Sequence, residues 1–240
     1  MSMFPNSQTR PIELGYGTDN RAVFNFFNAV YAWMFLGLAV TAAVGFFCSQ
    51  SPTMLRAMYG NGKSGIVALM LGAWVVAWLA QKAALQISAA AGTVLFLVYA
   101  ALIGAMLSGI FIVYPASTLL AAFVLTAGTF GAMSLYGYFT KRDLTTIGSY
   151  LVMGVIGLFL ASIVNVFLAN DALSWFITYA VLAVFIGLTA YETQQLRTLA
   201  QEHGHDHKLA SRLAVCGSIM LYISFINIFV SILRIMGGRR

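Results

Sequence analysis

One acidic residue stands where the sequence otherwise avoids charge. Glu192 follows a long apolar run in the segment GLTAYETQQLR (187–197), which reaches its first basic residue at Arg197. A carboxylate can exchange a proton or bind a cation, so Glu192 is a candidate proton sensor or cation ligand. Tyr191 and Arg197 are candidate neighbours of a gate at this point. The alternative is a surface acid that lies near Arg197.

A second set of polar residues has the spacing of a helix face. Ser224, Asn227, Ser231 and Arg234 follow one another at intervals of three, four and three residues, among Leu, Ile, Phe and Val. This spacing places them on one side of an α-helix. Such a side can line a water-filled path, or it can only hydrogen-bond to neighbouring helices, and both alternatives remain open.

Three histidines alternate in the segment EHGHDHK, at His203, His205 and His207. Imidazoles can bind a transition metal or titrate near pH 6.5, although a polar loop tip is the simpler interpretation. No Ser/His/Asp or Cys/His arrangement stands out, and only Glu192 among the seven acids is placed for chemistry. We therefore predict that the protein is not an enzyme and has no cofactor.

The composition indicates a membrane protein. The chain of 240 residues is 60% hydrophobic and only 8% charged, whereas a soluble domain has about 25% charged residues. The net charge of +6 comes from basic residues scattered between apolar runs, so no basic patch indicates nucleic-acid binding. We expect the lipid bilayer to be the main partner.

The uncharged stretches predict an all-α fold. Each membrane span needs about 20 apolar residues, and Pro115 divides the longest uncharged stretch into two helices. The prediction is a polar N-terminal tail at 1–23 and a seven-helix transmembrane domain at 24–236, with helices at approximately 24–48, 64–80, 87–112, 116–139, 145–168, 173–199 and 212–236. The glycine pairs Gly128 with Gly131, Gly154 with Gly157, and Gly104 with Gly109 predict close helix packing.

Basic residues predict the orientation. Eight Lys and Arg residues fall on the side of the N-terminal tail and five on the other side. The positive-inside rule then predicts a multi-pass membrane protein with its N-terminus inside and its C-terminus outside.

The last helix is expected inside the bundle, because a polar side within a membrane turns towards protein or water. Glu192 and the polar row should then approach within about one helical turn. A carboxylate at that depth would lose hydration, which makes it a candidate proton-sensing group.

Three separated segments carry a resemblance to a known family. Residues 126–167, the segment GLTAYETQQLR and the segment LYISFINIFVSILRIMG resemble, in the same order, parts of the Bax inhibitor-1/YccA family, also called the transmembrane Bax inhibitor motif proteins. The resemblance implies seven helices with the last one enclosed by the other six. It also implies a calcium leak controlled by pH through two facing acids.

The sequence departs from the family at one of these acids. Glu192 stands where the family usually has Asp, and Ser224 stands where it usually has a second Asp. Two carboxylates that share a proton titrate as a coupled pair, which one carboxylate beside a hydroxyl cannot do. Calcium also prefers several oxygen ligands. The di-acid gate of the family should therefore be altered in this chain.

Two functions follow as hypotheses. The first is a pH-responsive, calcium-permeable leak channel of the bacterial inner membrane, with a cytoplasmic N-terminus and a periplasmic C-terminus. Calcium or protons would be the permeant ions, Glu192 would titrate, and the path would be lined by Ser224, Asn227, Ser231 and Arg234. The second is a non-conducting modulator of a membrane-anchored AAA+ protease or another membrane complex. The resemblance implies this second activity for bacterial members, and the polar N-terminal tail would be the contact.

Overall fold

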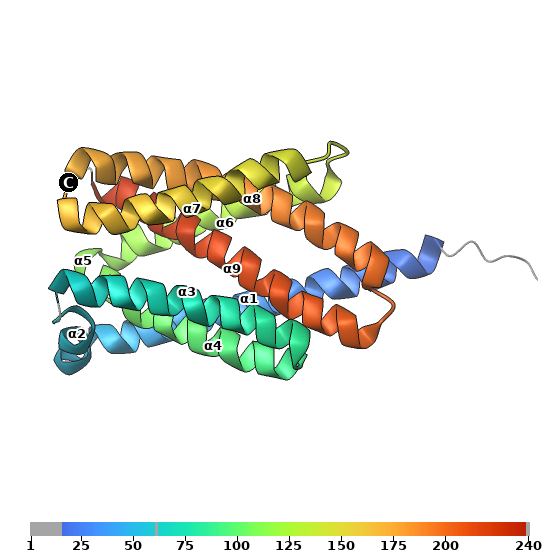
Figure 1. The fold of residues 1–240 in the computed structure, drawn as a ribbon, viewed down its shortest axis with the longest axis horizontal. Coiled ribbons are helices and arrows are strands. Elements are labelled where there is room, and N and C mark those ends of the chain that lie inside the picture. Colours follow the sequence, from blue (N-terminus) through green and yellow to red (C-terminus); the bar gives the residue numbers. More distant parts are fainter. Residues whose placement is uncertain (1–15, 61, 239–240) are drawn as a thin grey trace, which may run out of the picture.

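The computed structural model describes residues 16–60 and 62–238, and this part of the chain is helical without a strand (Figure 1). Seven of its helical segments are long and apolar enough to cross a membrane, which confirms the predicted all-α, polytopic class. These spans are Arg21–Ser49, Val67–Gln86, Ala89–Val113, Ala116–Phe139, Thr145–Leu168, Asp171–His203 and His207–Gly237.

The helices alternate between the two ends of the bundle. In chain order they are α1 Tyr16–Ser49, α2 Pro52–Tyr59, α3 Gly62–Gln86, α4 Ala89–Met106, α5 Ile110–Val113, α6 Ala116–Phe139, α7 Thr145–Leu168, α8 Asp171–His203 and α9 His207–Gly237. Helix α2 is a short helix in the link after the first span, where the side chain of Ser51 caps it. Helices α4 and α5 form one span with a break at residues 107–109.

Two helices run past the ends that their charges suggested. Helix α3 continues beyond residue 80 to Gln86 because Lys82 stays in the helix, with its ammonium 4.8 Å from the centre of the Trp78 ring. Helix α9 begins at His207 instead of 212, since the Asp206 carboxylate accepts hydrogen bonds from the backbone of Lys208 and Leu209.

The start of the chain differs from the expected tail. Helix α1 begins at Tyr16, so residues 16–23 of that tail are helical. Residues 1–15, like Arg239 and Arg240, lie outside the described residues. The expected division at Pro115 is present, because Tyr114 is extended and Pro115 directly precedes α6.

Helix α9 is the centre of the bundle, as the sequence predicted. It crosses diagonally between the α3–α4 pair and the group formed by α6, α7 and α8 (Figure 1), and it contacts α1, α3, α4, α6 and α8. In its most apolar window 61% of the residues are buried, against at most 33% for any other span. Its buried side chains include Ile219, Tyr222 and Ile228.

The bundle has two ends, which we call the N-face and the C-face. The N-face holds the start of α1 and the α3–α4, α6–α7 and α8–α9 links, and the C-face holds α2, the α7–α8 link and the end of α9 (Figure 1). Between them, large apolar side chains such as Phe35, Val94 and Met153 point outward. Such an outer surface fits contact with lipid tails.

The glycine pairs expected to pack helices together mostly do not. A methyl group added at Gly128, Gly131 or Gly157 would meet nothing within 4 Å, so these glycines lie on open surface. At Gly154 the added methyl would only touch the Val184 side chain at 3.6 Å. Gly104 is the exception, because an added methyl there would meet the backbone of α1, and further close helix contacts lie at other glycines, some of them beside the candidate site.

Candidate functional site

Glu192 and Ser224 meet inside the bundle. The Ser224 hydroxyl donates a hydrogen bond of 2.7 Å to Oε2 of Glu192, across the interface of α8 and α9. Glu192 is 8% exposed and Ser224 is fully buried. Glu192 lies eleven residues before the end of α8 at His203, which is about 16 Å along the helix. The acid is therefore enclosed by protein and does not project into water.

Close packing on both sides keeps Glu192 in place. At Gly137 the backbone of α6 touches the backbone of α8 at Ala190, so no larger residue fits there without displacing a helix. Gly148 of α7 similarly lies against the ring of Tyr191. The residues just before Glu192 are thus held by two neighbouring helices.

The expected gate neighbours point elsewhere. Tyr191 packs on α7, and Arg197 donates a hydrogen bond of 2.6 Å to the carbonyl of Tyr138 while its guanidinium lies over the Tyr138 ring. Within residues 16–60 and 62–238, the recorded ion pair joins Glu202 and His203, and none joins Glu192 to Arg197. The alternative of a surface acid near Arg197 does not match this arrangement.

A chain of hydroxyls lies beside the acid, and the sequence analysis missed it. The Tyr31 hydroxyl contacts Ser134, and Ser134 is 3.0 Å from the hydroxyl of Thr193, the residue after Glu192. Thr193 also donates to the carbonyl of Thr189. The sequence did contain a signal for this chain of hydroxyls. Residues with hydroxyl groups stand in the middle of apolar runs, and within a membrane such groups need hydrogen-bond partners in the protein.

Gln194 fastens the α6–α7 link to the same stretch of α8. Its Oε1 accepts a hydrogen bond from the backbone of Leu144, and its Nε2 donates to the carbonyl of Arg142. In this link, the hydroxyl and the backbone N–H of Thr145 hydrogen-bond to Asp143 and hold the pKa of that carboxyl below its usual range. The N-face is therefore ordered up to two residues from Glu192.

The remaining polar residues of α9 belong to a different place. Asn227, Ser231 and Arg234 line a cavity of about 350 Å³ towards the C-face. We call it the C-face cavity. Its other lining residues come from α3, α7, α8 and α9 itself, and they are Met70, Ser162, Asn165, Val166, Ser174, Ile177, Thr178, Val181 and Val230. The polar row is therefore split, with Ser224 at the acid and the other three residues at the cavity.

Apolar side chains separate the cavity from the acid. On α8 the cavity ends at Val181, and the buried residues Phe185 and Leu188 follow before Glu192. On α9 the buried residue Phe225 follows Ser224, and the buried residue Ile228 follows Asn227. Apolar side chains of both helices thus lie between the C-face cavity and the acid.

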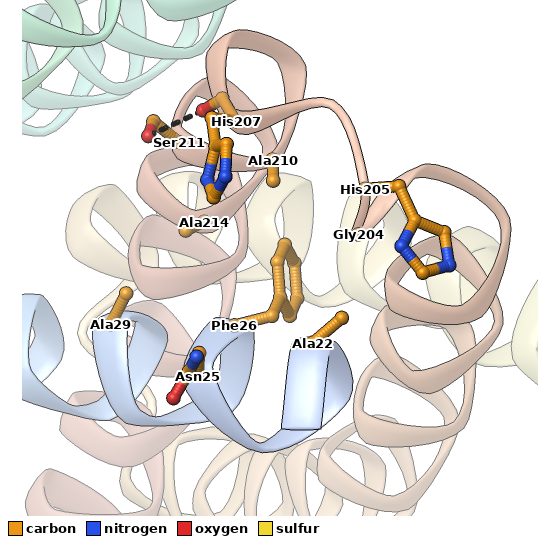
Figure 2. A pocket seen from close by; sticks show the side chains of 10 residues that line it. All are labelled: Ala22, Asn25, Phe26, Ala29, Gly204, His205, His207, Ala210, Ser211 and Ala214. Atoms are coloured by element: carbon orange, nitrogen blue, oxygen red, sulfur yellow. Dashed lines mark hydrogen bonds between the residues drawn. The ribbon is translucent and has the colours of Figure 1, made fainter. Parts of the chain in front are cut away.

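The three histidines do not form a metal site. No group of three His, Cys, Asp or Glu side chains in the described part of the chain could hold a metal ion. Figure 2 shows that His205 and His207 extend in different directions from the α8–α9 link. Both border a pocket of about 370 Å³ against the start of α1, where Asn25 and Phe26 form the opposite wall.

The acid alone is also a poor calcium ligand set. Its side chain accepts a hydrogen bond from the hydroxyl of Ser224, whereas calcium takes six to eight oxygen ligands. What the arrangement can do is change charge: a proton on Glu192 converts a buried anion into a neutral group at the interface of α8 and α9. The site therefore fits a sensor better than a storage site for calcium.

Comparison with known proteins adds a family assignment. A model of the family described as "Inhibitor of apoptosis-promoting Bax1" matches residues 23–240. The chain is 42% identical over 212 residues to a protein of Escherichia coli K12 named "Inner membrane protein YbhL", and the match covers 88% of this chain and 90% of that protein.

Other bacteria have similar proteins at lower identity. An uncharacterized protein of Borreliella burgdorferi is 37% identical over 215 residues, covering 90% of this chain and 92% of its own length. An uncharacterized protein of Rickettsia prowazekii is 34% identical over 211 residues, covering 88% of each chain. Because these matches span nearly the full lengths, the similarity concerns the whole bundle.

Proposed function

Since the chain belongs to the Bax inhibitor-1 family of membrane proteins, we propose that it is a calcium-permeable leak whose opening is controlled by protonation of Glu192. The observation that supports this most directly is the buried hydrogen bond between Ser224 and Glu192. It joins the two helices that would have to separate for ions to pass. The expected setting is a bacterial inner membrane, with the N-face in the cytoplasm because Lys82, Lys141, Arg142 and Arg212 lie there.

The direction of the pH response follows from two opposing energies. Ionised Glu192 in the closed bundle has one hydroxyl in place of its hydration shell, which costs several kcal/mol. A hydrogen bond to a charged acceptor is stronger than one to a neutral acceptor, but by only about 1 kcal/mol. Desolvation is the larger effect, so ionisation should favour entry of water and opening. We expect neutral Glu192 to keep the bundle closed.

Calcium flux into proteoliposomes tests this proposal. Wild-type protein should conduct more at about pH 8 than at about pH 5, and Glu192→Gln should remove the pH dependence because an amide stays neutral. Glu202→Gln is the matched control, since Glu202 is an exposed acid of the same helix and should leave the response unchanged. Flux no greater than that of empty vesicles at every pH would exclude the leak.

A second candidate is a non-conducting modulator of a membrane-anchored AAA+ protease. The observation in its favour is the pocket beside the start of α1 (Figure 2), because a partner that grips the N-terminal segment would reach this pocket on the N-face. Deletion of residues 2–15, which ends before α1 begins at Tyr16, should abolish co-purification with the protease and leave any flux intact. Unchanged co-purification after the deletion would exclude the N-terminal segment as the contact, and a full-length chain that does not co-purify with the protease would exclude this candidate.

A further inference from the structure

The lining of the C-face cavity is polar but contains no acid. Seven of its residues carry polar side chains, and the single formal charge among them is that of Arg234. Asp171, in the first turn of α8, is exposed and is not part of the lining. The entrance of a path for cations would be expected to carry negatively charged side chains instead.

The hydrogen bonds of the lining residues leave oxygen atoms available. The Ser162 hydroxyl donates to the carbonyl of Leu158, and the Thr178 hydroxyl donates to the carbonyl of Ser174. Nδ2 of Asn227 donates to the carbonyl of Ile223, so its Oδ1 is the atom left as an acceptor. A cavity of about 350 Å³ with several acceptors has room and partners for water.

Arg234 stands at the opening of this cavity. It lies in the last turn of α9 and is exposed, whereas Ser231, one turn deeper, is 3% exposed. Asn227 lies about 10 Å deeper along the helix. The guanidinium has no ion pair with a described residue. Arg234 therefore places a positive charge, without an acidic partner among the described residues, at the lining of this cavity.

We propose that Arg234 is a charge filter at the entrance of a water-filled C-face cavity, where it favours small anions and disfavours cations, divalent cations most of all. The consequence for ion flux rests on the proposed leak, but the filter itself does not. In this view Arg234 makes the leak slow from the C-face, and the protein limits calcium entry by repulsion as well as by the closed bundle.

The expected size of the effect follows from Coulomb's law. A charge about 5 Å away, at an effective dielectric constant between that of water and that of a protein surface, changes the local concentration of a monovalent ion by roughly threefold to tenfold. The energy doubles for a divalent ion, so its factor is the square of the monovalent one, roughly tenfold or more. Removal of Arg234 should therefore affect divalent cations more than monovalent ones.

Charged thiol reagents test the filter without ion flux. In a chain with Cys48→Ser and Cys216→Ser, we replace Ser231→Cys and measure its rate of modification by an anionic and a cationic methanethiosulfonate in nanodiscs. Ser117→Cys, an exposed position at the start of α6 on the same face, is the reference. Relative to it, the ratio of the anionic to the cationic modification rate should be higher by roughly tenfold to a hundredfold, because the charge raises the local concentration of one reagent and lowers that of the other. Arg234→Gln should abolish this preference, and Arg234→Lys should keep it.

The outcomes separate the filter from the leak. The filter would be overturned if the ratio of anionic to cationic modification were the same with and without Arg234, or if neither reagent modified Ser231→Cys. Either result would overturn it even if calcium flux is present. A preference that depends on Arg234, in a protein without flux, would support the filter and reject the leak. Where flux is present, Arg234→Gln should raise calcium flux by a larger factor than potassium flux, and an equal rise in both would contradict the divalent selectivity.

Discussion

The polar side of α9 has two parts that are built differently. At Ser224 the hydroxyl is fully buried and bonded to an acid, and the neighbouring helices α6 and α8 touch backbone to backbone at Gly137 and Ala190. From Asn227 to Arg234 the same side of the helix faces a cavity of about 350 Å³. Residues with helical spacing therefore lie on one side of a helix, but their surroundings can still differ.

The packed part should be far less tolerant of added volume. Gly137→Val should destabilise the protein by about 3 kcal/mol or more, because the new side chain meets the backbone of Ala190, which cannot rotate away. Gly157→Val is the matched control, since an added methyl there meets nothing within 4 Å. Thermal unfolding in detergent measures both, and equal stability of the two variants would contradict the described packing.

Hydroxyl deletion should separate the two parts by a smaller margin. Ser224→Ala removes the hydrogen bond to Glu192 and leaves a buried polar group without that partner, which should cost about 2 kcal/mol. Ser231→Ala, at the wall of the C-face cavity, should cost less than about 0.5 kcal/mol, because water can reach that position. Denaturation of the two variants at the same pH tests this difference. A larger loss for Ser231→Ala would show that the cavity is not hydrated.

The smallest effect is expected at the α6–α7 link. Hydrogen bonds from Thr145 keep the pKa of Asp143 below its usual range, so the ionised form is stabilised in the folded protein. This contribution is fully present above the unfolded pKa and is lost as the pH falls through the folded value. Asp143→Asn should therefore lower the melting temperature slightly at neutral pH and make no difference at strongly acidic pH. A difference that grows upon acidification would contradict the assignment.

Much of the fold was accessible from the positions of charged residues. Gaps between charges identified all seven spans, and Pro115 marked the division of the longest gap. The ends were less accessible, since Lys82 continues α3 by lying over Trp78 and Asp206 caps α9 earlier than the charges suggested. Both depend on side-chain contacts that a count of charges does not contain.

The site was accessible only in part. A polar row and one acid in an apolar run were enough to predict the approach of Glu192 and Ser224. The division of the row, the hydroxyl chain at Tyr31 and Ser134, and the clamp formed by Gln194 depend on which helix lies opposite each position. The glycine pairs show the same limit, because small residues in an apolar run predict close packing, yet an added methyl at Gly128 or Gly131 would meet nothing within 4 Å.

The central place of α9 has a consequence for how the protein is made. Translation proceeds from the N-terminus, so α1 to α8 enter the membrane before the helix that most of them surround. Before α9 is inserted, Thr41 lacks its hydrogen bond with Tyr222 of α9. The Glu192 carboxylate likewise lacks its hydrogen bond with Ser224 of α9. Nascent chains that stop before α9 should therefore be recognised as incomplete and degraded. Insertion of α9 completes the contacts of the bundle in one step.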